Sequence, residues 1–587
     1  MYGGVKNMAK QKPLFKNEIE EKETKDKRNE IIRELLRPHK TIRDAIHEDI
    51  MITKLETTII DTEEFQRLRK IRQLGPTHLV YPSANHTRFE HSLGTLYMTQ
   101  YLFECALKNP FKDPQVFMYV ELPYFIMHYP PTTITYSDAL ITNYHVLLTR
   151  ICALLHDLAH IPFGHTLENE GFLFDEQWED DERVKHFLND DSTIGKIIID
   201  ELSKSGIDGK QFLQEVRNIL TAKSEDIENL PYPFVSDIIN NTICGDLLDY
   251  LSRDLYFSGL RETYDKRFLS YFYIGMNNGK ARLILRLLKP STGKVRRDVF
   301  SETLHLLRLR YSLAEKVYYH HAKVSASAMI ISAVTSAIKN KILSKRDLFT
   351  IGDDELLSLL TKDDIGSFIV NNLKQRKLYK PVYALKYAEP LMGDTRFQKK
   401  NEIKESLKNK ENRYNTERAL ERANMLEPGQ IVVYCPGPEM GQKAVKTLSE
   451  WNGTIGSLDA IMEEDRRNEI EMSIVKKHLN LWSMYVFVDR TLSEEIRANV
   501  ASDSAKFFQL SNEIEIDKYR QDRPNHWERF AASVEEELRV SLSSKEREEI
   551  KQAILVSRPP DKEREHYKIP AYDEYRSYVK KYIEGLK

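Results

Sequence analysis

Four side chains that can ligate a divalent metal fall in three short segments of the sequence. His91 lies in RFEHSLG, His156 and Asp157 are adjacent in ALLHDLAHIPFGH, and Asp246 lies in CGDLLDYLSRD. Two imidazoles and two carboxylates suit Mn, Fe, Zn or Mg and leave coordination positions for water and substrate. A metal held in this way polarises a phosphate and activates a water molecule. The set therefore indicates the chemistry of a metal-dependent phosphohydrolase.

The second segment supports this interpretation by its density of ionisable groups. A His-Asp dipeptide is common by chance, and a single histidine in a helix is usually a satisfied core residue. HDLAHIPFGH, however, places three histidines and one aspartate in ten residues of an otherwise apolar stretch. Ionisable groups buried at this density need charged partners or a metal. The metal site is therefore favoured over the core alternative.

Cationic side chains flank the candidate ligands. Arg88 lies three residues before the first histidine ligand, so one helix turn would direct both toward the same cleft, where a guanidinium binds phosphate oxygens in bidentate fashion. His160 and His165 follow the His-Asp pair, where an imidazole could protonate a leaving oxygen or stabilise developing charge. The alternatives are a structural ion pair of Arg88 with Glu90 or Asp246, and capping roles for the two histidines.

The elements that would position these groups are helices. In LTRICALLHDLAH, Ile151, Leu155 and Leu158 recur at i, i+4 and i+7, which predicts an amphipathic helix. His156 and His160 are four residues apart, so they would share a different stripe of that helix.

A second helix is predicted for TICGDLLDYLSRDLYFSGL, with one polar face. Asp246, Asp249, Tyr250 and Arg253 recur at i, i+3, i+4 and i+7, and the leucines between them supply apolar packing. Residues 298–334 are predicted to form one or two further long helices.

Four regions are predicted along the chain. Residues 1–38 are rich in Lys and Glu and are expected to form a mobile charged arm with one short helix. Residues 39–345 form the mainly helical region that carries the candidate site. Within it, residues 108–145 are rich in proline and aromatic residues and are expected to be a loop or small insert that packs over the cleft or against another subunit.

The fourth region, residues 346–587, has a different character. Residues 395–425 are dominated by Lys, Glu, Asn and Arg, which predicts a solvated helix or linker. GQIVVYCPGPEMG and LWSMYVFVDRT each contain a short β-branched run bounded by turn residues, which predicts two strands with a helix-like stretch between them. The predicted fold is thus mainly α, with a smaller α+β region at the C-terminal side.

Composition narrows the class of protein. The net charge of −2 gives no overall basic footprint, which disfavours coating of nucleic acid and leaves open only a local basic cleft. The N-terminus lacks the apolar core of a signal peptide, and no apolar run approaches eighteen residues, so we expect a cytoplasmic protein that does not enter a membrane. The four cysteines are scattered without a CxxC pair, as in a reducing compartment.

The order and spacing of several motifs resemble those of the HD-domain dNTP triphosphohydrolases, the bacterial dGTPases and the animal SAM-and-HD-domain enzyme. The resemblance covers about residues 40–345, through KTIRDAIHEDI, IIDTEEFQRLRKIRQLGPTHLVYPSANHTRFEHSLG, HDLAHIPFGH, DLLDYLSRDLYFSGL, YDKRFL and VYYHHAKV. It is weak over the C-terminal third, and the SAM domain has no counterpart here. The resemblance implies an HD-type helical core and hydrolysis of a dNTP to a deoxynucleoside and triphosphate.

The resemblance also implies roles for individual residues. The metal ligands would be His91, His156, Asp157 and Asp246. The substrate-binding residues would be Arg88 at the α-phosphate, Gln73 and Leu74 against sugar and base, Tyr250 and Asp254 near the sugar, and Tyr318 beside the nucleoside. The catalytic residues would be His165 as the acid for the leaving 5′-oxygen, His160 close to the phosphates, and Asp246, with His186 supporting His165.

One position departs from the family pattern. Relatives usually place Lys or Arg directly after the third-motif aspartate, but this chain has Leu247. A cation that would hold the β- and γ-phosphates is therefore missing there. Arg308, Arg310 or Lys323 would have to replace it, or the substrate has fewer phosphates or a different shape.

The resemblance extends to a regulatory site. Asp61, Gln66 and Arg69 match positions of a regulatory nucleotide site in the animal enzyme, and a structural role for the same string is the alternative. The predicted partners are a dNTP substrate, an activating nucleotide and further copies of the chain, with a divalent metal as cofactor. Two other functions stay open: another HD-type phosphoesterase (nucleotidase, cyclic-nucleotide phosphodiesterase or nuclease), and a nucleotide-sensing regulatory protein whose turnover is incidental.

Overall fold

The structure is a computed structural model that describes most of the chain from residue 30 onward. It describes residues 30–585 except for 110–112, 114, 123–124, 130–138, 174–180, 224, 290–291, 295, 388–394, 437–446, 452–453, 459–479, 515–530, 532–533, 536 and 558–571. Residues 1–29 of the predicted arm and all five prolines of the predicted insert lie outside the described residues.

The folded part begins before residue 38. A short helix over residues 30–35, as expected for the arm, buries Ile32 and Leu36 in the main hydrophobic core. An antiparallel hairpin follows, made of β1 (Pro38–Asp44) and β2 (Glu48–Thr53).

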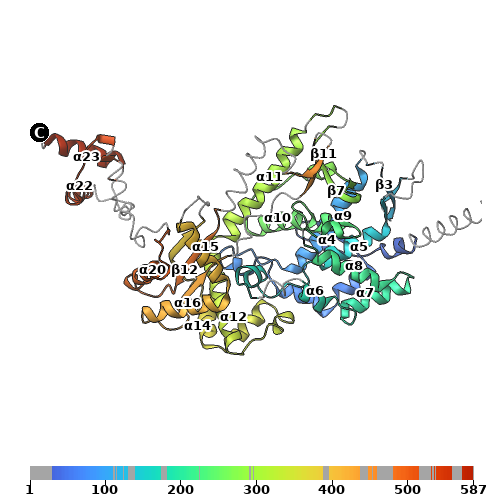
Figure 1. Cartoon of the computed structure of the whole chain (residues 1–587), viewed down its shortest axis with the longest axis horizontal. Coiled ribbons are helices and arrows are strands. Elements are labelled where there is room, and N and C mark those ends of the chain that lie inside the picture. The colour runs from blue at the N-terminus through green and yellow to red at the C-terminus, as the bar shows by residue number, and fades with distance from the viewer. Residues whose placement is uncertain are drawn as a thin grey trace, which may run out of the picture.

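Three helices form the centre of the helical region: α4 (Arg88–Lys108), α5 (Asn143–Leu155) and α10 (Gly245–Phe257). Helix α4 packs against both of the others (Figure 1). The surrounding helices are α2 (Lys54–Ile60), α3 (Glu63–Gln66), α6 (Asp181–Phe187), α7 (Thr193–Lys204), α8 (Gly209–Thr221) and α9 (Pro233–Ile239). The one-turn helices are η1 (Arg67–Lys70), η2 (Gly75–Leu79), η3 (Thr166–Glu170), η5 (Ile227–Asn229), η6 (Lys266–Tyr271) and η8 (Asp347–Phe349). The mainly helical fold class predicted from the sequence is confirmed.

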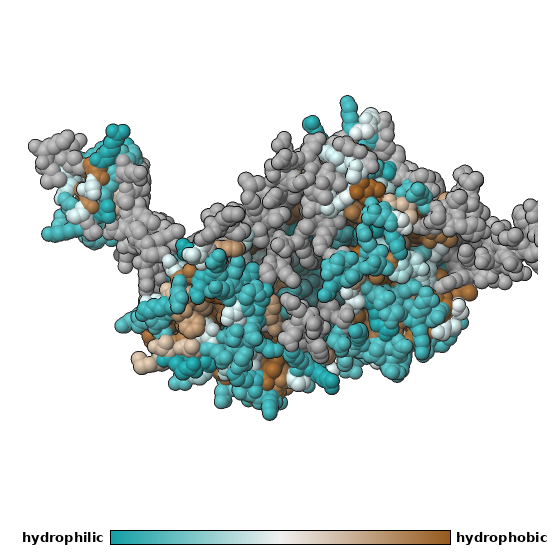
Figure 2. Space-filling view, viewed as in Figure 1, coloured by the Kyte–Doolittle hydropathy of each residue, from teal (hydrophilic) through white to brown (hydrophobic). Residues whose placement is uncertain are grey.

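The long helical stretch after residue 297 is two helices. They are α11 (Arg297–Leu313) and α12 (His321–Lys339), joined by the π-helical turn η7 (Ala314–Tyr318). By length and composition alone, α12 could cross a membrane, but 78% of its apolar window is buried inside the fold. It therefore behaves as a core helix, and the face of the molecule in Figure 2 is mostly hydrophilic over its described residues.

Helix α5 ends earlier than the apolar spacing predicted. Its last residue is Leu155, and turns occupy residues 156–159. His156 and His160 therefore do not share a helical stripe, which corrects the prediction. Further along, Phe163 and Gly164 adopt positive φ angles of 58° and 44°, which no right-handed helix contains. The segment thus becomes a tight loop that lies against the helix ends of the site.

The predicted insert is a small sheet rather than a plain loop. Strand β3 (Val116–Leu122) lies between β4 (Phe125–Tyr129), which is antiparallel to it, and β5 (Ala139–Thr142), which is parallel. Apolar side chains such as Val116 and Ile141 are buried in the main core, which agrees with the expectation that the aromatic-rich segment packs.

The C-terminal region contains the expected α+β unit. The two predicted strands are β9 (Ile431–Tyr434) and β12 (Ser483–Val488), and both are confirmed. They pair antiparallel in the sheet order β8-β12-β9, whose first strand, β8 (Lys380–Lys386), the sequence did not reveal. The helices nearby are α13 (Asp353–Leu360), α14 (Asp364–Lys374), α15 (Thr395–Lys408), α16 (Lys410–Ala423) and α20 (Glu494–Phe508).

The charged stretch over residues 395–425 is not a solvated linker. Helix α16 buries Glu417, Arg418 and Glu421. Arg418 Nε donates to Glu421 Oε2 at 2.5 Å, and Glu417 accepts the N–H of Val433 at 2.9 Å. The helix alternative of the prediction is confirmed, and α15 is mostly exposed or half-buried, whereas α16 has paired charges inside the fold, which give the same composition as a solvated face.

Two more strands connect the C-terminal region to the helical region. β10 (Leu448–Trp451) and β11 (Thr454–Ser457) extend the hairpin of β6 (Phe272–Asn277) and β7 (Lys280–Arg286) in the order β11-β10-β7-β6. The helix-like stretch expected between the two C-terminal strands is therefore partly strand, and residues 459–479 lie outside the described residues. Helices α22 (Ser544–Ser557) and α23 (Tyr572–Gly585) share a separate small core and lie apart at the left of Figure 1.

Candidate metal centre

The predicted metal ligands meet where three helix ends converge. Helix α4 supplies His91, the turn after α5 supplies His156 and Asp157, and the first turn of α10 supplies Asp246. His91 Nε2 lies 3.0 Å from Asp246 Oδ1 and 3.2 Å from His156 Nε2. Asp157 completes the group, with Oδ1 3.4 Å from His156 Nε2 and Oδ2 3.7 Å from His91 Nε2.

This donor set fits a divalent cation. The ligand atoms of His91, His156 and Asp246 all lie within 4.8 Å of one another, and they come from nitrogen and oxygen donors that transition metals prefer. Burial lowers the pKa of His91, but hydrogen bonds that its ring donates to Asp246 and Asp249 raise it to about 10. Since a metal ligand must be deprotonated, a cation at His91 Nε2 would have to displace this proton.

His91 is oriented from its other side by a buried charge network. Its Nδ1 lies 2.7 Å from Asp249 Oδ2, and Asp249 Oδ1 lies 2.6 Å from His47 Nε2. Arg253 donates to both oxygens of Asp249, each at 2.9 Å, and to both oxygens of Asp44 at 2.9 and 3.1 Å. A carboxylate behind a ligating histidine fixes the ring and its tautomer. The sequence placed Asp249 and Arg253 on the polar face of α10 but did not reveal this role.

A glycine lets the two helices approach closely enough for this contact. A Cβ added to Gly94 of α4 would lie 2.0 Å from Asp249 Oδ1 and 2.4 Å from Arg253 Nη2. A side chain at position 94 would therefore displace the Asp249 carboxylate and the Arg253 guanidinium. The orientation of His91 therefore depends on a residue one turn along its own helix.

Arg88 presents a buried guanidinium beside the candidate metal centre. Its side chain is 1% exposed, and Nη1 donates to Asp157 Oδ2 at 2.6 Å. Nε and Nη2 are buried with no hydrogen-bond partner among the described residues. A Cβ on Gly164 would lie 2.4 Å from Nη2, so the glycine leaves the guanidinium free. Buried donors without acceptors are costly, and a phosphate oxygen would satisfy both.

The two predicted catalytic histidines lie beside this group. His160 Nε2 is 3.1 Å from Asp157 Oδ1 and its Nδ1 is 2.6 Å from Glu168 Oε2. Burial and Arg88 lower the pKa of His160, but Glu168 and Asp157 raise it more, so the net shift is upward. His165 is 62% exposed at its side chain. The surrounding protein and the charges of His160 and Arg88 lower its pKa, and a bound phosphate would raise it again.

Glu168, which sequence reasoning missed, contacts the predicted catalytic residue His160. Its oxygens accept from the Ile161 N–H at 3.0 Å and from Arg183 Nη1 at 2.6 Å, in addition to His160. His160, His165 and Glu168 also form a second group with the spacing of metal ligands. Because Arg183 already neutralises Glu168, a cation is less favoured here than at His91. The signal in the sequence was an acid three residues after His165.

The predicted nucleoside residues lie together in part. Tyr318 donates to Asp254 Oδ2 at 2.6 Å, and His86 Nε2 lies 2.8 Å from Asp254 Oδ1. Tyr250 lies within electrostatic range of Asp246 and Asp254. The structure therefore brings Tyr318, Asp254 and Tyr250 to the Asp246 side of the centre.

The other two predicted nucleoside residues lie on the segment before α4. Gln73 Oε1 is buried with no hydrogen-bond partner among the described residues, and Leu74 is partly buried against the core. An amide oxygen without a partner is available to a ligand donor. The Gln73 backbone N–H is bound to His86 O at 3.0 Å, which joins this segment to the start of α4.

The structure also separates the three candidate replacements for the missing phosphate cation. Lys323 is buried and donates to Glu170 Oε1 at 2.5 Å, so it is already neutralised. Arg308 is exposed. Arg310 is half-buried, within electrostatic range of Tyr250 and Asp246, and makes no side-chain hydrogen bond in the described part of the chain. Arg310 is therefore the replacement that the geometry favours.

The predicted regulatory residues have local partners. Gln66 Nε2 donates to Ile60 O at 2.8 Å and its Oε1 accepts from Arg69 Nε at 2.8 Å, while Asp61 is exposed at the end of α2. Their neighbour Arg67 donates to Leu158 O and His160 O at 2.8 and 2.9 Å. The string thus has a structural part, and a regulatory role stays a prediction.

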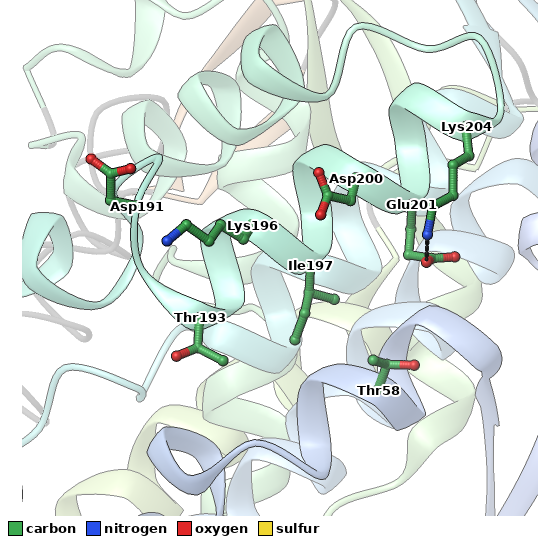
Figure 3. Close-up of a pocket in the computed structure, with 8 residues that line it drawn as sticks. All are labelled: Thr58, Asp191, Thr193, Lys196, Ile197, Asp200, Glu201 and Lys204. Atoms are coloured by element: carbon green, nitrogen blue, oxygen red, sulfur yellow. Dashed lines mark hydrogen bonds and ion pairs between the residues drawn. The ribbon is translucent and has the colours of Figure 1, made fainter.

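The resemblance implied that His186 supports His165, and no contact between these two residues is found in the described part of the chain. His186 is exposed and stacks on Phe349, with ring centroids 4.9 Å apart. A separate surface pocket between α2 and α7 is lined by acids, lysines and threonines, among which Lys204 pairs with Glu201 (Figure 3). It contains none of the residues of the metal centre.

Comparison with known proteins agrees with this geometry. The chain matches the HD domain over residues 88–254 and the HD associated region over residues 302–512. It is 28% identical to an uncharacterised protein of Methanocaldococcus jannaschii over 79% of this chain and 82% of that protein. It is 26% identical to the deoxynucleoside triphosphate triphosphohydrolase SAMHD1 homolog of Dictyostelium discoideum, over 58% of this chain and 59% of that protein.

A further match is the human deoxynucleoside triphosphate triphosphohydrolase SAMHD1, at 27% identity over 51% of this chain and 44% of that protein. The chain therefore spans about half the length of these two named relatives. The HD-domain match begins at Arg88 and ends at Asp254, so it encloses the whole candidate metal centre. The chain belongs to the HD-domain phosphohydrolases, with an HD domain that contains the candidate metal ligands and an HD-associated region that follows it in the sequence.

Proposed function

We propose that the protein hydrolyses deoxynucleoside triphosphates to a deoxynucleoside and triphosphate. The observation that carries the proposal is Arg88, whose Nε and Nη2 have no acceptor among the described residues while Nη1 is fixed on Asp157, one of the candidate metal ligands. A phosphate bound by these donors would lie directly beside the metal centre. The two relatives named as deoxynucleoside triphosphate triphosphohydrolases support the choice of substrate class.

The residues around the α-phosphate divide the work. A divalent cation held by the four ligands would polarise the phosphoryl oxygen and lower the pKa of a water molecule. Arg88 would neutralise the charge that grows on the phosphoryl oxygens, and its buried position makes that interaction stronger than in water. Because Asp157 holds one edge of the guanidinium, the other edge is presented in a fixed direction.

Two imidazoles serve the leaving 5′-oxygen. His165 faces solvent at the mouth of the site, where it can hold a proton once a phosphate has raised its pKa. His160 is fixed between Asp157 and Glu168 and stabilises charge near the phosphates. In this proposal His165 is the general acid and His160 is the fixed cation beside it.

The ends of the substrate meet different residues. Tyr318, with its hydroxyl on Asp254, and Tyr250 would form the wall for the sugar. Gln73 and Leu74 would lie against sugar and base. Arg310 would hold the β- and γ-phosphates, in place of the Lys or Arg that relatives have at the position of Leu247.

The proposal has further parts that rest on the sequence. They are a divalent metal drawn from Mn, Fe, Mg and Zn, an activating nucleotide at Asp61, Gln66 and Arg69, a homo-oligomeric assembly and a cytoplasmic location. The base preference, the activator and the number of copies all affect which nucleotides are turned over, so they bear on the result of the nucleotide screen described next.

The test is a screen of all canonical nucleoside triphosphates, alone and in pairs, with Mn²⁺ or Mg²⁺ and identification of products. The proposal predicts a deoxynucleoside together with intact triphosphate. Stepwise loss of phosphate would contradict it. Pairs are included because one nucleotide can activate hydrolysis of another.

A second candidate function rests on Leu247. Its side chain is 2% exposed and packs in the core, so it offers no charge to a third phosphate. Another HD-type activity on shorter or cyclic phosphates, or on single-stranded ends, needs no such charge. Mono-, di- and cyclic nucleotides and short single strands in the same screen separate the two functions. A purely nucleotide-sensing role would show as binding of the same nucleotides without turnover.

A further inference from the structure

A carboxylate from the HD-associated region reaches two loops of the metal centre. Asp353, the first residue of α13, is fully buried. Its Oδ1 accepts the backbone N–H of Phe163 at 2.7 Å, and its Oδ2 accepts the backbone N–H of Arg72 at 3.0 Å. These donors lie 190 and 281 residues away in sequence.

The Phe163 loop needs an external acceptor. Phe163 and Gly164 both have positive φ, so the chain between His160 and His165 leaves regular structure. A buried N–H in such a loop has no ladder partner and must find another acceptor. Asp353 is that acceptor, and the residue that follows the loop is the predicted general acid His165.

The Arg72 segment carries the phosphate and nucleoside residues. Its neighbours bind the start of α4, since Gln73 N donates to His86 O at 3.0 Å and Arg88 N donates to Ile71 O at 2.9 Å. The Arg72 N–H points away from this bridge and onto Asp353. Asp353 therefore binds the residue directly before Gln73. The same segment is tied to Arg88 through the hydrogen bond from Arg88 N–H to Ile71 O.

The two loops and α13 are in direct contact. A Cβ added to Gly75 would lie 3.3 Å from Phe163 O and 3.1 Å from Thr166 Oγ1. A Cβ on Gly352, just before Asp353, would lie 2.3 Å from Lys70 Cβ. The first turn of α13 is thus seated tightly against the segment that leads to Arg72.

We propose that Asp353 is a positioning residue that holds the phosphate-binding segment and the general-acid loop at a fixed mutual distance. A buried carboxylate with one weak ion pair, to Arg72 Nη1 at 3.4 Å, is costly to retain. Its two backbone contacts explain why it is there. The HD-associated region would then act on turnover without touching substrate. The effect on turnover rests on the proposed function, whereas the effect on the loops does not.

The experiment compares Asp353→Ala with Asp354→Ala in the full-length protein. Asp354 is the adjacent residue and also pairs with the Arg72 side chain, at Nη1 and 3.3 Å, but its side chain is 80% exposed. The backbone N–H groups of Arg72 and Phe163 donate to Asp353 instead. Hydrogen exchange by mass spectrometry is followed in peptides that span residues 71–75 and 161–165. kcat, KM and metal content are measured on the same samples.

Asp353→Ala is expected to raise exchange in both peptides and to lower kcat by about tenfold to a hundredfold, because small misplacements of reacting groups have effects of that order. KM and metal content stay within about twofold of wild type, and Asp354→Ala changes none of these quantities. If Asp353→Ala fails to fold, Asp353→Asn takes its place. Its amide can accept only one of the two N–H groups, so one peptide loses protection and the loss of kcat is smaller.

Unchanged exchange in both peptides would overturn the inference. So would faster exchange with unchanged kcat, since the loops would then move without consequence. If the wild-type protein hydrolyses no nucleotide, the proposed function fails, and the exchange comparison still decides whether Asp353 joins the two loops.

Discussion

The two sides of His91 contain similar residues in opposite conditions. On the Nδ1 side, Arg253 is fully buried and every nitrogen of its guanidinium is bound, to Asp249 and Asp44. On the Nε2 side, Arg88 is equally buried, yet two of its three nitrogens have no partner among the described residues. Both arginines lie on helices that contribute metal-ligand residues.

The difference teaches how to distinguish structural charge from functional charge. A saturated network keeps a ring in place and has nothing left to offer a ligand. An unsaturated donor is retained only where another molecule supplies the acceptor. Burial alone would not separate Arg88 from Arg253, because both are at or below 1% exposure.

The largest expected effect on activity comes from removing a candidate metal ligand on the Nε2 side of His91, which is the open side. His156→Ala should lower kcat by on the order of a thousandfold, because the stabilisation lost is several kcal/mol. Steady-state hydrolysis of the best nucleotide from the screen measures it. His186→Ala, an exposed histidine stacked on Phe349, is the matched control and should keep its activity. Equal activity of the two variants would remove His156 from the site.

The next effect should fall on stability rather than on chemistry. Arg253→Met removes the guanidinium that binds both Asp249 and Asp44 and leaves these buried carboxylates undercompensated, which costs about 3–5 kcal/mol of unfolding free energy. Denaturant unfolding followed by circular dichroism measures it. An unfolding midpoint equal to that of the wild type would mean that the network is not saturated as described.

Arg88→Lys should lower activity and leave stability nearly unchanged, the reverse of Arg253→Met. A lysine keeps the charge but loses the planar fork, so kcat/KM is expected to fall by about a hundredfold. Its unfolding free energy should change by less than about 1 kcal/mol, because Nε and Nη2 have no partner to lose in the part of the chain that the structure describes. A large loss of stability with little loss of activity would show that Arg88 is structural.

The smallest effect concerns the pH dependence of metal binding. The pKa of His91 is about 10, raised by Asp246 and Asp249. Below that pH a proton on His91 competes with the metal. The dissociation constant for the metal should therefore fall by up to about tenfold for each unit by which the pH rises between pH 6 and 8. Isothermal titration with Mn²⁺ measures the slope. Asp249→Asn lowers the pKa of His91 and should flatten the slope, and an affinity independent of pH in the wild type would contradict this account.

Much of the open side was predictable because its residues are unusual where they stand. Three histidines in an apolar decapeptide and an arginine one turn before His91 are local signals. The helices around them follow from apolar periodicity, although α5 stops at Leu155 and the following loop has positive φ angles at Phe163 and Gly164, which no pattern of residue types reveals.

The Nδ1 side of His91 and the residue that positions the Phe163 loop were harder to predict from the sequence. Asp249 binds His91 across 158 residues, and Asp353 binds Phe163 across 190. Such pairings depend on how helices cross, which in turn depends on close approaches such as that at Gly94. Strand β8 was missed for a similar reason, since its pairing with β12 comes from residues nearly a hundred positions away.

Crystals of the protein soaked in Mn²⁺ and measured for anomalous scattering test the central claim most directly. The account predicts one strong peak, about 2.2 Å from His91 Nε2, from His156 Nε2 and from the carboxylates of Asp157 and Asp246. A peak at His160, His165 and Glu168 instead, or no peak at either group, would contradict it.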